Sequence, residues 1–349
     1  MISRAFGSLP SGEAVKAFTL ANASGASAEI LTYGSVVRAL RMPDREGRLA
    51  DVVLGFDRLE PYLAIRACFG AVVGRIAGRV TGGRLSIDGR ACALACNDGS
   101  NHLHGGVLGL DRRLWVAEAA FQKDGAASVR LSYRSPDGEE GYPGNVDIAA
   151  TYTLTAANEL IFETEAAADR ATPISLTQHS YFNLAGDGCG RILDHVVQVF
   201  ADEFVPIDGS LTLLDRRERV RGTGADLTQP RPLRDALPNL LAGHGDHYPL
   251  RGPDAAVPRE PTLAAEVAEP GSGRVLQVLT DNSSLQFYTG YALDGAAVGK
   301  SGRPYGPYAG FCMECEGYPN ASTVGGFGDI MVRPGRPQRR RTVFAFSTF

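Results

Sequence analysis

The stretch Val146–Leu154, VDIAATYTL, decides the fold class of this chain. Its even-numbered positions are all apolar, whereas Asp147, Thr151 and Thr153 stand between them. Because successive side chains of a strand point to opposite faces, this alternation predicts a half-buried strand. Comparable short runs recur along the sequence, at Ala28–Tyr33, Ser128–Tyr133, Leu160–Glu165, Val275–Thr280, Leu285–Tyr288, Phe311–Glu316 and Thr342–Phe346.

Turn residues separate these runs. The 349 residues include 42 glycines and 20 prolines, and clusters such as Asp88-Gly89 and Pro136-Asp137-Gly138 are typical of tight turns. The sequence therefore predicts an all-β chain folded as a large antiparallel β-sandwich. Without a repeat or a low-complexity linker, we expect one domain over residues 1–349. Pro230–Pro238 is predicted to hold a short helical turn, and Gly252–Pro261 to form a surface excursion.

Composition limits the possible partners. A formal net charge of −4 gives no electrostatic basis for binding nucleic acid or an anionic membrane, and favours a neutral substrate. The sequence has neither an apolar run of ~18 to 20 residues nor a secretory signal at its start. Six cysteines are too few for a disulfide scaffold in a chain of 349 residues, so reduced thiols in the cytoplasm are expected. A processed periplasmic form is the alternative.

The segment Ser175–Gly186, SLTQHSYFNLAG, carries the most informative polar pattern. If it is extended, Phe182 and Leu184 point to the core. The opposite face would then present groups that bind hydroxyls and exchange protons, from Thr177, His179, Tyr181 and Asn183. This pattern suggests a polyol or sugar site.

Two further segments concentrate histidine. Asn97–Gly106, NDGSNHLHGG, would place His102 and His104 on one face if it is extended, or the two imidazoles could simply cap backbone groups in a loop. Gly243–Tyr248, GHGDHY, could bind sugar hydroxyls through its aspartate. It could also supply metal ligands, but a solvated loop is the better interpretation of that segment alone, since no known ligand spacing is present.

The segment Phe311–Asn320, FCMECEGYPN, supplies the candidate base. In an extended strand Cys312, Glu314 and Glu316 share a face. Burial raises the pKa of a carboxyl group toward values that suit proton transfer, so Glu314 is a candidate general base. The CxxC spacing of Cys312 and Cys315 has no second pair, and thiols that fill space are favoured over a zinc or redox site.

Taken in order, NHLHGG, TQHSYFNLAG, a GxDH turn, LQFYTG and FCxE followed by YP closely resemble the aldose 1-epimerase family. The resemblance extends from Leu31–Val37 to Val332–Gly335. It implies a large β-sandwich that interconverts the α and β anomers of free aldoses. It also implies that no metal, nucleotide or other cofactor is needed.

The resemblance further implies a role for individual residues. Glu314 corresponds to the general base, His179 to the acid that protonates the ring oxygen, and His104 to a second active-site histidine. The substrate-binding positions fall on Arg79, Asp246 and Gln286. Without the resemblance, Arg79 and Gln286 would be interpreted as ordinary surface residues. For His179 the alternative is a hydrogen-bonded core histidine, and for Glu314 a structural ion-pair partner, but the functional interpretation is favoured for these two.

Several positions depart from the family pattern. Gly78 stands where many members have asparagine, Glu316 replaces a glutamine, and Cys315, Asn320 and Tyr248-Pro249 also differ. The competing hypotheses are a non-catalytic sugar-binding protein on the same fold, an epimerase of phosphorylated hexoses, and a metal-dependent isomerase that uses the histidines. The preferred aldose is open, and both a monomer and a homodimer fit the sequence.

Overall fold

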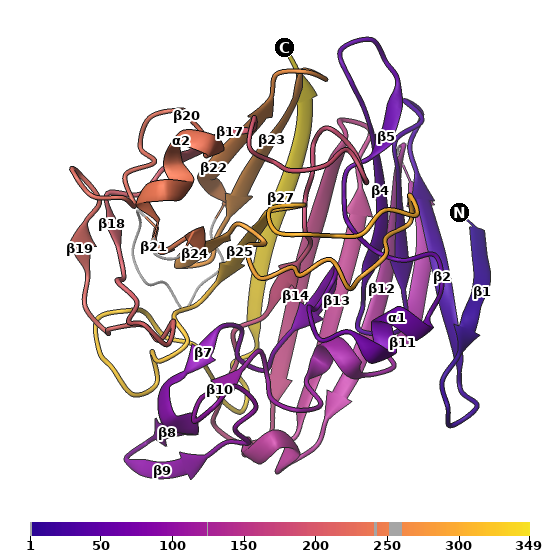
Figure 1. Ribbon diagram of the computed structural model, residues 1–349. Coiled ribbons are helices and arrows are strands. Elements are labelled where there is room, and N and C mark those ends of the chain that lie inside the picture. Colours follow the sequence, from indigo (N-terminus) through magenta and orange to yellow (C-terminus); the bar gives the residue numbers. More distant parts are fainter. Residues whose placement is uncertain (1, 124, 241–242, 251–259) are drawn as a thin grey trace.

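The computed structural model describes residues 2–123, 125–240, 243–250 and 260–349. Two large antiparallel sheets pack against each other and enclose the main core (Figure 1). The larger sheet has nine strands in the spatial order β11 (Val116–Lys123), β12 (Ala126–Ser135), β13 (Val146–Leu154), β14 (Glu159–Ala168), β27 (Gln338–Thr348), β23 (Arg274–Thr280), β22 (Thr262–Glu269), β17 (Val196–Val199) and β20 (Arg231–Pro232). The predicted antiparallel β-sandwich is confirmed.

The second sheet is a meander at the N-terminal end of the chain. Its five strands are β1 (Ile2–Ser8), β2 (Ala14–Ala21), β3 (Ser27–Leu31), β4 (Val37–Pro43) and β5 (Leu49–Asp51). Side chains such as Leu20 and Ile30 from this sheet enter the same core as Leu131 and Tyr152 from the larger one. Each sheet thus buries the apolar face of the other.

Smaller sheets stand beside the sandwich. A three-stranded sheet consists of β21 (His247–Pro249), β24 (Ser284–Tyr288) and β25 (Cys312–Glu316). Five strand pairs complete the set: β6 (Ala71–Val73) with β16 (Thr177–His179), β7 (Arg79–Val80) with β10 (His102–Leu103), β8 (Arg84–Ile87) with β9 (Arg90–Ala93), β15 (Thr172–Pro173) with β26 (Met331–Val332), and β18 (Glu203–Phe204) with β19 (Glu218–Arg219).

Helices are short and peripheral. Among the described residues the α-helices are α1 (Glu60–Ala64) and α2 (Leu233–Ala236), the second followed by a 3-10 turn at Leu237–Asn239, where the sequence predicts a helical turn. Further 3-10 turns lie at Thr81–Gly83, Leu110–Arg112 and Glu139–Gly141. No helix in the described ranges has the length and apolar character needed to cross a lipid bilayer. The predicted excursion at Gly252–Pro261 lies almost entirely outside the described residues.

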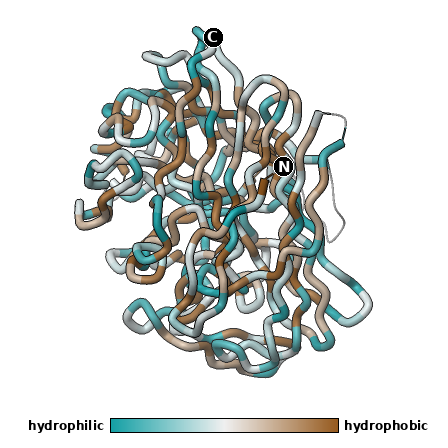
Figure 2. The backbone as a smooth tube through the Cα atoms, turned by 90° about the vertical axis from the view of Figure 1, so that its right-hand side faces the viewer, coloured by the Kyte–Doolittle hydropathy of each residue, from teal (hydrophilic) through white to brown (hydrophobic). Residues whose placement is uncertain are grey.

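Burial follows the alternation seen in the sequence. In β13, Val146, Ile148 and Tyr152 are buried whereas Asp147 is exposed, as predicted. Hydrophobic and hydrophilic residues alternate along much of the tube in Figure 2. On the outer face, Glu163 pairs in register with Arg341 and forms an ion pair with it at 2.7 Å. The period of two therefore sets both the core and the solvent face.

Phe344 of β27 tests the packing of the main core. It is 1% exposed, and its ring lies 5.3 Å from that of Phe182, between centroids. Because Phe344→Ala leaves a cavity in a close-packed interior, we expect the free energy of unfolding to fall by about 3–5 kcal/mol. Denaturant unfolding measures this. The matched control is Phe121→Ala on β11, which is 52% exposed and should change stability by about 0.5 kcal/mol or less. Equal effects of the two substitutions would contradict the assigned core.

Candidate functional site

A cavity lies beside the three-stranded sheet and encloses about 320 Å³, a size typical of small-molecule sites. Its walls combine residues that are far apart in the sequence. The polar and aromatic side chains that line it are Arg66, Arg79, His104, His179, Tyr181, His244, His247, Gln286, Tyr288, Tyr291, Glu314 and Glu316.

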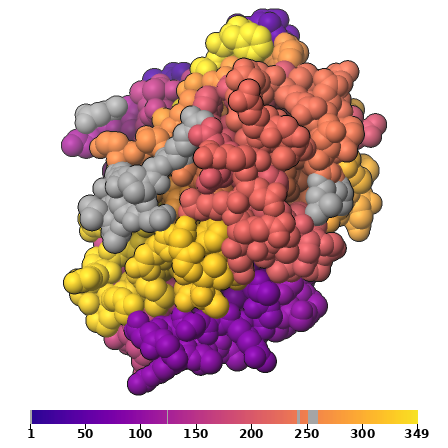
Figure 3. Space-filling model, turned by 90° about the vertical axis from the view of Figure 1, so that its left-hand side faces the viewer, coloured from indigo at the N-terminus to yellow at the C-terminus, as the bar shows by residue number. Residues whose placement is uncertain are grey.

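Hydrogen bonds tie together the segments that form one flank of this cavity. The Asn320 amide donates to Thr81 Oγ1 and to Asp215 Oδ1, both at 3.0 Å. On the face shown in Figure 3, segments from the first third, the middle and the C-terminal part of the chain meet. Asn320 is thus a structural link next to Pro319, which lines the cavity.

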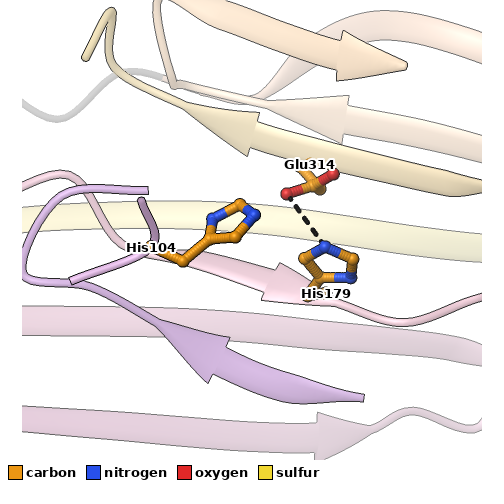
Figure 4. Close-up of side chains that lie close together, drawn as sticks. All are labelled: His104, His179 and Glu314. Atoms are coloured by element: carbon orange, nitrogen blue, oxygen red, sulfur yellow. Dashed lines mark ion pairs between the residues drawn. The ribbon is translucent and has the colours of Figure 1, made fainter. Parts of the chain in front are cut away.

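The side chains of Glu314 and His179 point toward each other (Figure 4). Glu314 projects from β25 and His179 from the end of β16, and each is at most 4% exposed. His179 Nε2 lies 3.6 Å from Glu314 Oε2, which is longer than a hydrogen bond. A molecule lying beside both atoms in the cavity could therefore bond to each of them. Burial raises the pKa of Glu314, while the charges of His179 and Arg79 lower it.

The other nitrogen of His179 contacts a thiol. Cys312 Sγ lies 3.6 Å from His179 Nδ1, and burial raises the pKa of Cys312 well above its usual value. The sulfur is therefore a neutral thiol. Cys312 and Cys315 lie on opposite faces of β25 and belong to different core clusters, so they do not form one dithiol site.

His104 meets the site from the loop after β10. Its backbone has φ of 51°, so the stretch is not extended there and His104 does not share a face with His102. His104 Nδ1 accepts a hydrogen bond from the Gly78 N–H at 3.1 Å, which leaves the proton of the neutral ring on Nε2. Burial, and then the neighbouring His179 and Arg79, lower the pKa of His104 well below its usual value. Its ring stacks edge-on to His179, with centroids 5.2 Å apart.

The two arginines near position 78 have different roles. Arg79 lines the cavity and pairs with Asp98 at 2.7 Å. Arg75 is 2% exposed and does not line it; its guanidinium donates to backbone carbonyls, including those of Ser135 and Gly144. Of these two arginines, Arg79 lines the cavity and Arg75 does not.

The small sheet aligns the remaining cavity groups. His247, Gln286 and Glu314 are register partners on β21, β24 and β25. Their side chains line the cavity in one row, and Glu316 lies one repeat further along β25. Burial, and then the nearby Glu314, raise the pKa of Glu316 well above its usual value.

Some sequence expectations are corrected by this arrangement. Asn183 does not reach the cavity: its amide donates to the carbonyls of Gly190 and Ala309 and so fixes a turn. His102 is structural, because its ring nitrogens contact the Ala95 carbonyl and the Tyr142 hydroxyl. His179 and Tyr181 remain from the polar face predicted for Ser175–Gly186, while Phe182 and Leu184 are in the core as predicted.

The segment Gly243–Tyr248 is not a solvated loop. His244, Asp246 and His247 are all buried, and the two histidines line the cavity. Asp246 is not among the lining residues, although burial raises its pKa to about 6. The interpretation of this segment as solvent-exposed is wrong, because the short strand β21 joins it to β24.

Sequence reasoning missed several lining residues. Tyr288 lies two residues after Gln286 on β24, so alternation could have revealed it. Arg66, Cys68 and Tyr291 lie outside strands, and no periodicity marks them.

One group of side chains has the composition of a metal site. Ligand atoms of His104, His179 and Glu314 all lie within 4.8 Å of one another. Two histidines and one glutamate form a known set of zinc ligands. The same three atoms face the space where a substrate would sit, so metal binding and proton transfer would compete for them.

Comparisons with known proteins agree with this geometry. The family model described as aldose 1-epimerase matches residues 16–345. Galactose mutarotase of Bos taurus is 42% identical over 344 residues, covering 98% of this chain and 97% of that protein. Aldose 1-epimerase of Escherichia coli K12 is 29% identical, with coverage of 97% and 96%.

Solved structures show the same fold. An aldose epimerase homologue from C. elegans superposes with a TM-score of 0.85 at 28% identity, covering 95% of this chain and 98% of that one. Galactose 1-epimerase from Lactobacillus acidophilus also gives a TM-score of 0.85, at 26% identity and with coverage of 99% and 98%. The chain belongs to the aldose 1-epimerase family.

Proposed function

We propose that this chain interconverts the α and β anomers of free aldoses by acid–base opening and closure of the sugar ring. It is an aldose 1-epimerase, an isomerase. The observation that carries the mechanism is the buried pair of Glu314 and His179, whose facing atoms are 3.6 Å apart and not hydrogen-bonded to each other. A carboxylate and an imidazole in this arrangement can move two protons on one bound molecule.

Glu314 acts as the base. Its carboxylate removes the proton of the anomeric hydroxyl, and the oxygen electrons form the aldehyde as the bond from C1 to the ring oxygen breaks. His179, as imidazolium, gives its proton to the leaving ring oxygen. Rotation about the C1–C2 bond turns the other face of the carbonyl toward the returning hydroxyl. Ring closure with the two proton transfers reversed then yields the other anomer.

The remaining residues hold the sugar. Neutral His104 offers its Nε2–H as a donor, since Nδ1 is occupied by Gly78. Arg79 can donate to two oxygens at once, and its place in the cavity wall supports this role. Gln286 stands in register between His247 and Glu314. Asp246 is proposed as a substrate contact on the family resemblance alone.

The cavity favours an unphosphorylated sugar. Arg66 and Arg79 are the arginines among its described lining residues, and Arg79 already pairs with Asp98. A phosphate would require more positive charge than this. The retained Glu314 and His179 likewise favour an enzyme over a protein that only binds sugar.

The wider setting is also part of the proposal. The cavity is lined by residues from Arg66 to Pro319, which supports one domain over the whole chain. The negative net charge supports a free sugar, and not nucleic acid or a membrane, as the partner. Six free cysteines support a cytoplasmic location, with the protein acting as a monomer or a homodimer.

Glu314→Gln tests the base. The amide keeps the shape of the side chain but cannot accept the proton, so the rate of anomer exchange should fall by about 100-fold or more. Polarimetry or NMR exchange on several free aldoses measures this rate. Glu163→Gln on the outer face of β14 is the matched control and should leave the rate unchanged, because its carboxylate only pairs with Arg341. Wild-type exchange by Glu314→Gln would rule out the assigned base.

The pH dependence of kcat/KM should reveal the effect of the Arg79 charge on the pKa of Glu314. Glu314 works when ionised, so kcat/KM falls as the pH drops through its pKa. The positive charge of Arg79 lowers that pKa. In Arg79→Gln the pKa of Glu314 rises, and the acidic limb of the kcat/KM profile should move to higher pH. Arg66 also lines the cavity but does not lower the pKa of Glu314. Arg66→Gln should therefore leave the acidic limb of the kcat/KM profile at its wild-type pH. A limb that stays in place in Arg79→Gln, or moves to lower pH, contradicts the assigned coupling.

Chelation separates acid–base catalysis from metal catalysis. If the nitrogen and oxygen atoms of His104, His179 and Glu314 act directly on the sugar, exhaustive dialysis against EDTA should leave the exchange rate unchanged. Elemental analysis of the dialysed protein verifies that metal has been removed. Loss of the rate on dialysis, with recovery on addition of zinc or manganese, would instead support a metal at these ligands.

A further inference from the structure

Beyond Glu314, the cavity contains a second pair of buried polar side chains that the mechanism does not use. Glu316 is 1% exposed and His247 is fully buried. Glu316 lies two residues after Glu314 on the same face of β25, about 7 Å further along the strand. Its Oε1 lies 3.6 Å from His247 Nδ1, too far for a hydrogen bond.

These groups lack the hydrogen bonds that buried polar atoms normally make. Within the described ranges, Glu316 Oε2 and both ring nitrogens of His247 have no hydrogen-bond partner. Leaving a buried polar group unpaired is destabilising, so natural proteins seldom retain several at one place. Because both side chains line the cavity, a bound molecule can supply the missing partners.

The backbone of Gly78 packs closely against this pair. Its φ is 77°, a conformation that glycine adopts without strain. A Cβ at this position would lie 2.6 Å from Pro319 Cγ and 3.1 Å from Glu316 Oε1. Any side chain at position 78 would therefore displace the wall or the carboxyl group of Glu316.

We infer that Glu316 and His247 form a recognition subsite that binds one ring hydroxyl of the aldose, away from the anomeric carbon. The inference rests on the proposed function. A hydroxyl can donate to the carboxyl oxygen of Glu316 and accept from the imidazole N–H of His247, which satisfies both side chains. Glu316 binds in this role and is not a second base.

The chemistry of His247 separates this subsite from the catalytic pair. Burial lowers the pKa of His247 to about 4, so at neutral pH its ring is uncharged. A neutral imidazole cannot act as the acid in the way that imidazolium at His179 does. The pair of Glu316 and His247 is thus suited to hydrogen bonding and not to ring opening.

A panel of deoxy aldoses tests the subsite. Each sugar lacks one hydroxyl, and anomer exchange is measured with the wild type and with Glu316→Ala. For the wild type, we expect one deoxy sugar to show a kcat/KM about 10- to 100-fold below the parent, through KM more than kcat, since leaving buried polar groups without a hydrogen-bond partner has about this effect. In Glu316→Ala the parent should fall by a similar factor, and the same deoxy sugar should then react as well as the parent.

Two further variants make the test decisive. Glu316→Gln retains hydrogen-bonding atoms and should preserve most of the difference in kcat/KM between the parent and the deoxy sugar. Glu316→Leu replaces the alanine variant if that protein does not fold. Glu163→Gln should show the wild-type profile for every sugar. The subsite is ruled out if no deoxy sugar loses rate with the wild type, or if Glu316→Ala slows the parent and all deoxy sugars by one common factor.

The experiments distinguish failure of the proposed function from failure of the subsite. If the wild type exchanges no aldose, the proposed activity is wrong, and the subsite is then tested by binding. NMR titration of the wild type and Glu316→Ala with the parent and the deoxy sugars would support it if one hydroxyl contributes to affinity only in the wild type. Equal affinities across the panel would overturn it.

Discussion

The pleat of β25 is the constraint on which the site depends. Met313 and Cys315 point into the main core, and this fixes the register of the strand. Glu314 and Glu316 must then point the other way, into the cavity. A slip of one residue would bury both carboxylates in hydrocarbon, at a cost the fold could not offset. Core packing on one face of a five-residue strand thus holds the reactive carboxyl group on the other.

That constraint explains which parts of the structure could be predicted. Where one face of a strand is buried, the alternation of residue types is strong, and β13 has the bounds that its sequence predicts. The orientation of Glu314 follows from the same rule. For His179 the pattern indicated the correct face, but the same pattern also placed Asn183 at the site. Asn183 instead bonds backbone carbonyls, because its segment leaves the strand after His179.

Contacts between distant loops could not be predicted from the alternation of residue types. Arg66 and Tyr291 line the cavity through turns whose paths depend on tertiary packing. His104 was identified by resemblance to the family. Its geometry, with φ of 51° and Nδ1 bonded to Gly78, has no counterpart in the sequence pattern. For Asp246 the motif predicts a sugar contact. Among the described residues, however, its neighbour His247 lines the cavity and Asp246 does not.

The environments of two neighbouring histidines differ in a way that suits two different roles. His104 is kept neutral by burial and by the positive groups around it, and its backbone contact fixes which nitrogen carries the proton. His179 faces the carboxyl group of Glu314, and its second nitrogen meets a neutral thiol. One imidazole can therefore donate a hydrogen bond without changing charge while the other exchanges a proton.

The departures from the family pattern at positions 78 and 316 are coupled by space. An asparagine at position 78 would meet Pro319 and Glu316 at distances shorter than van der Waals contact. Glycine there and a carboxyl group at 316 are therefore compatible with each other, whereas restoring the asparagine alone would move the wall of the cavity. The two differences act as one change, which places a glycine backbone directly against Pro319 and the unpaired carboxyl group of Glu316. Neither difference replaces Glu314 or His179, so the catalytic pair is retained while the cavity wall beside it differs.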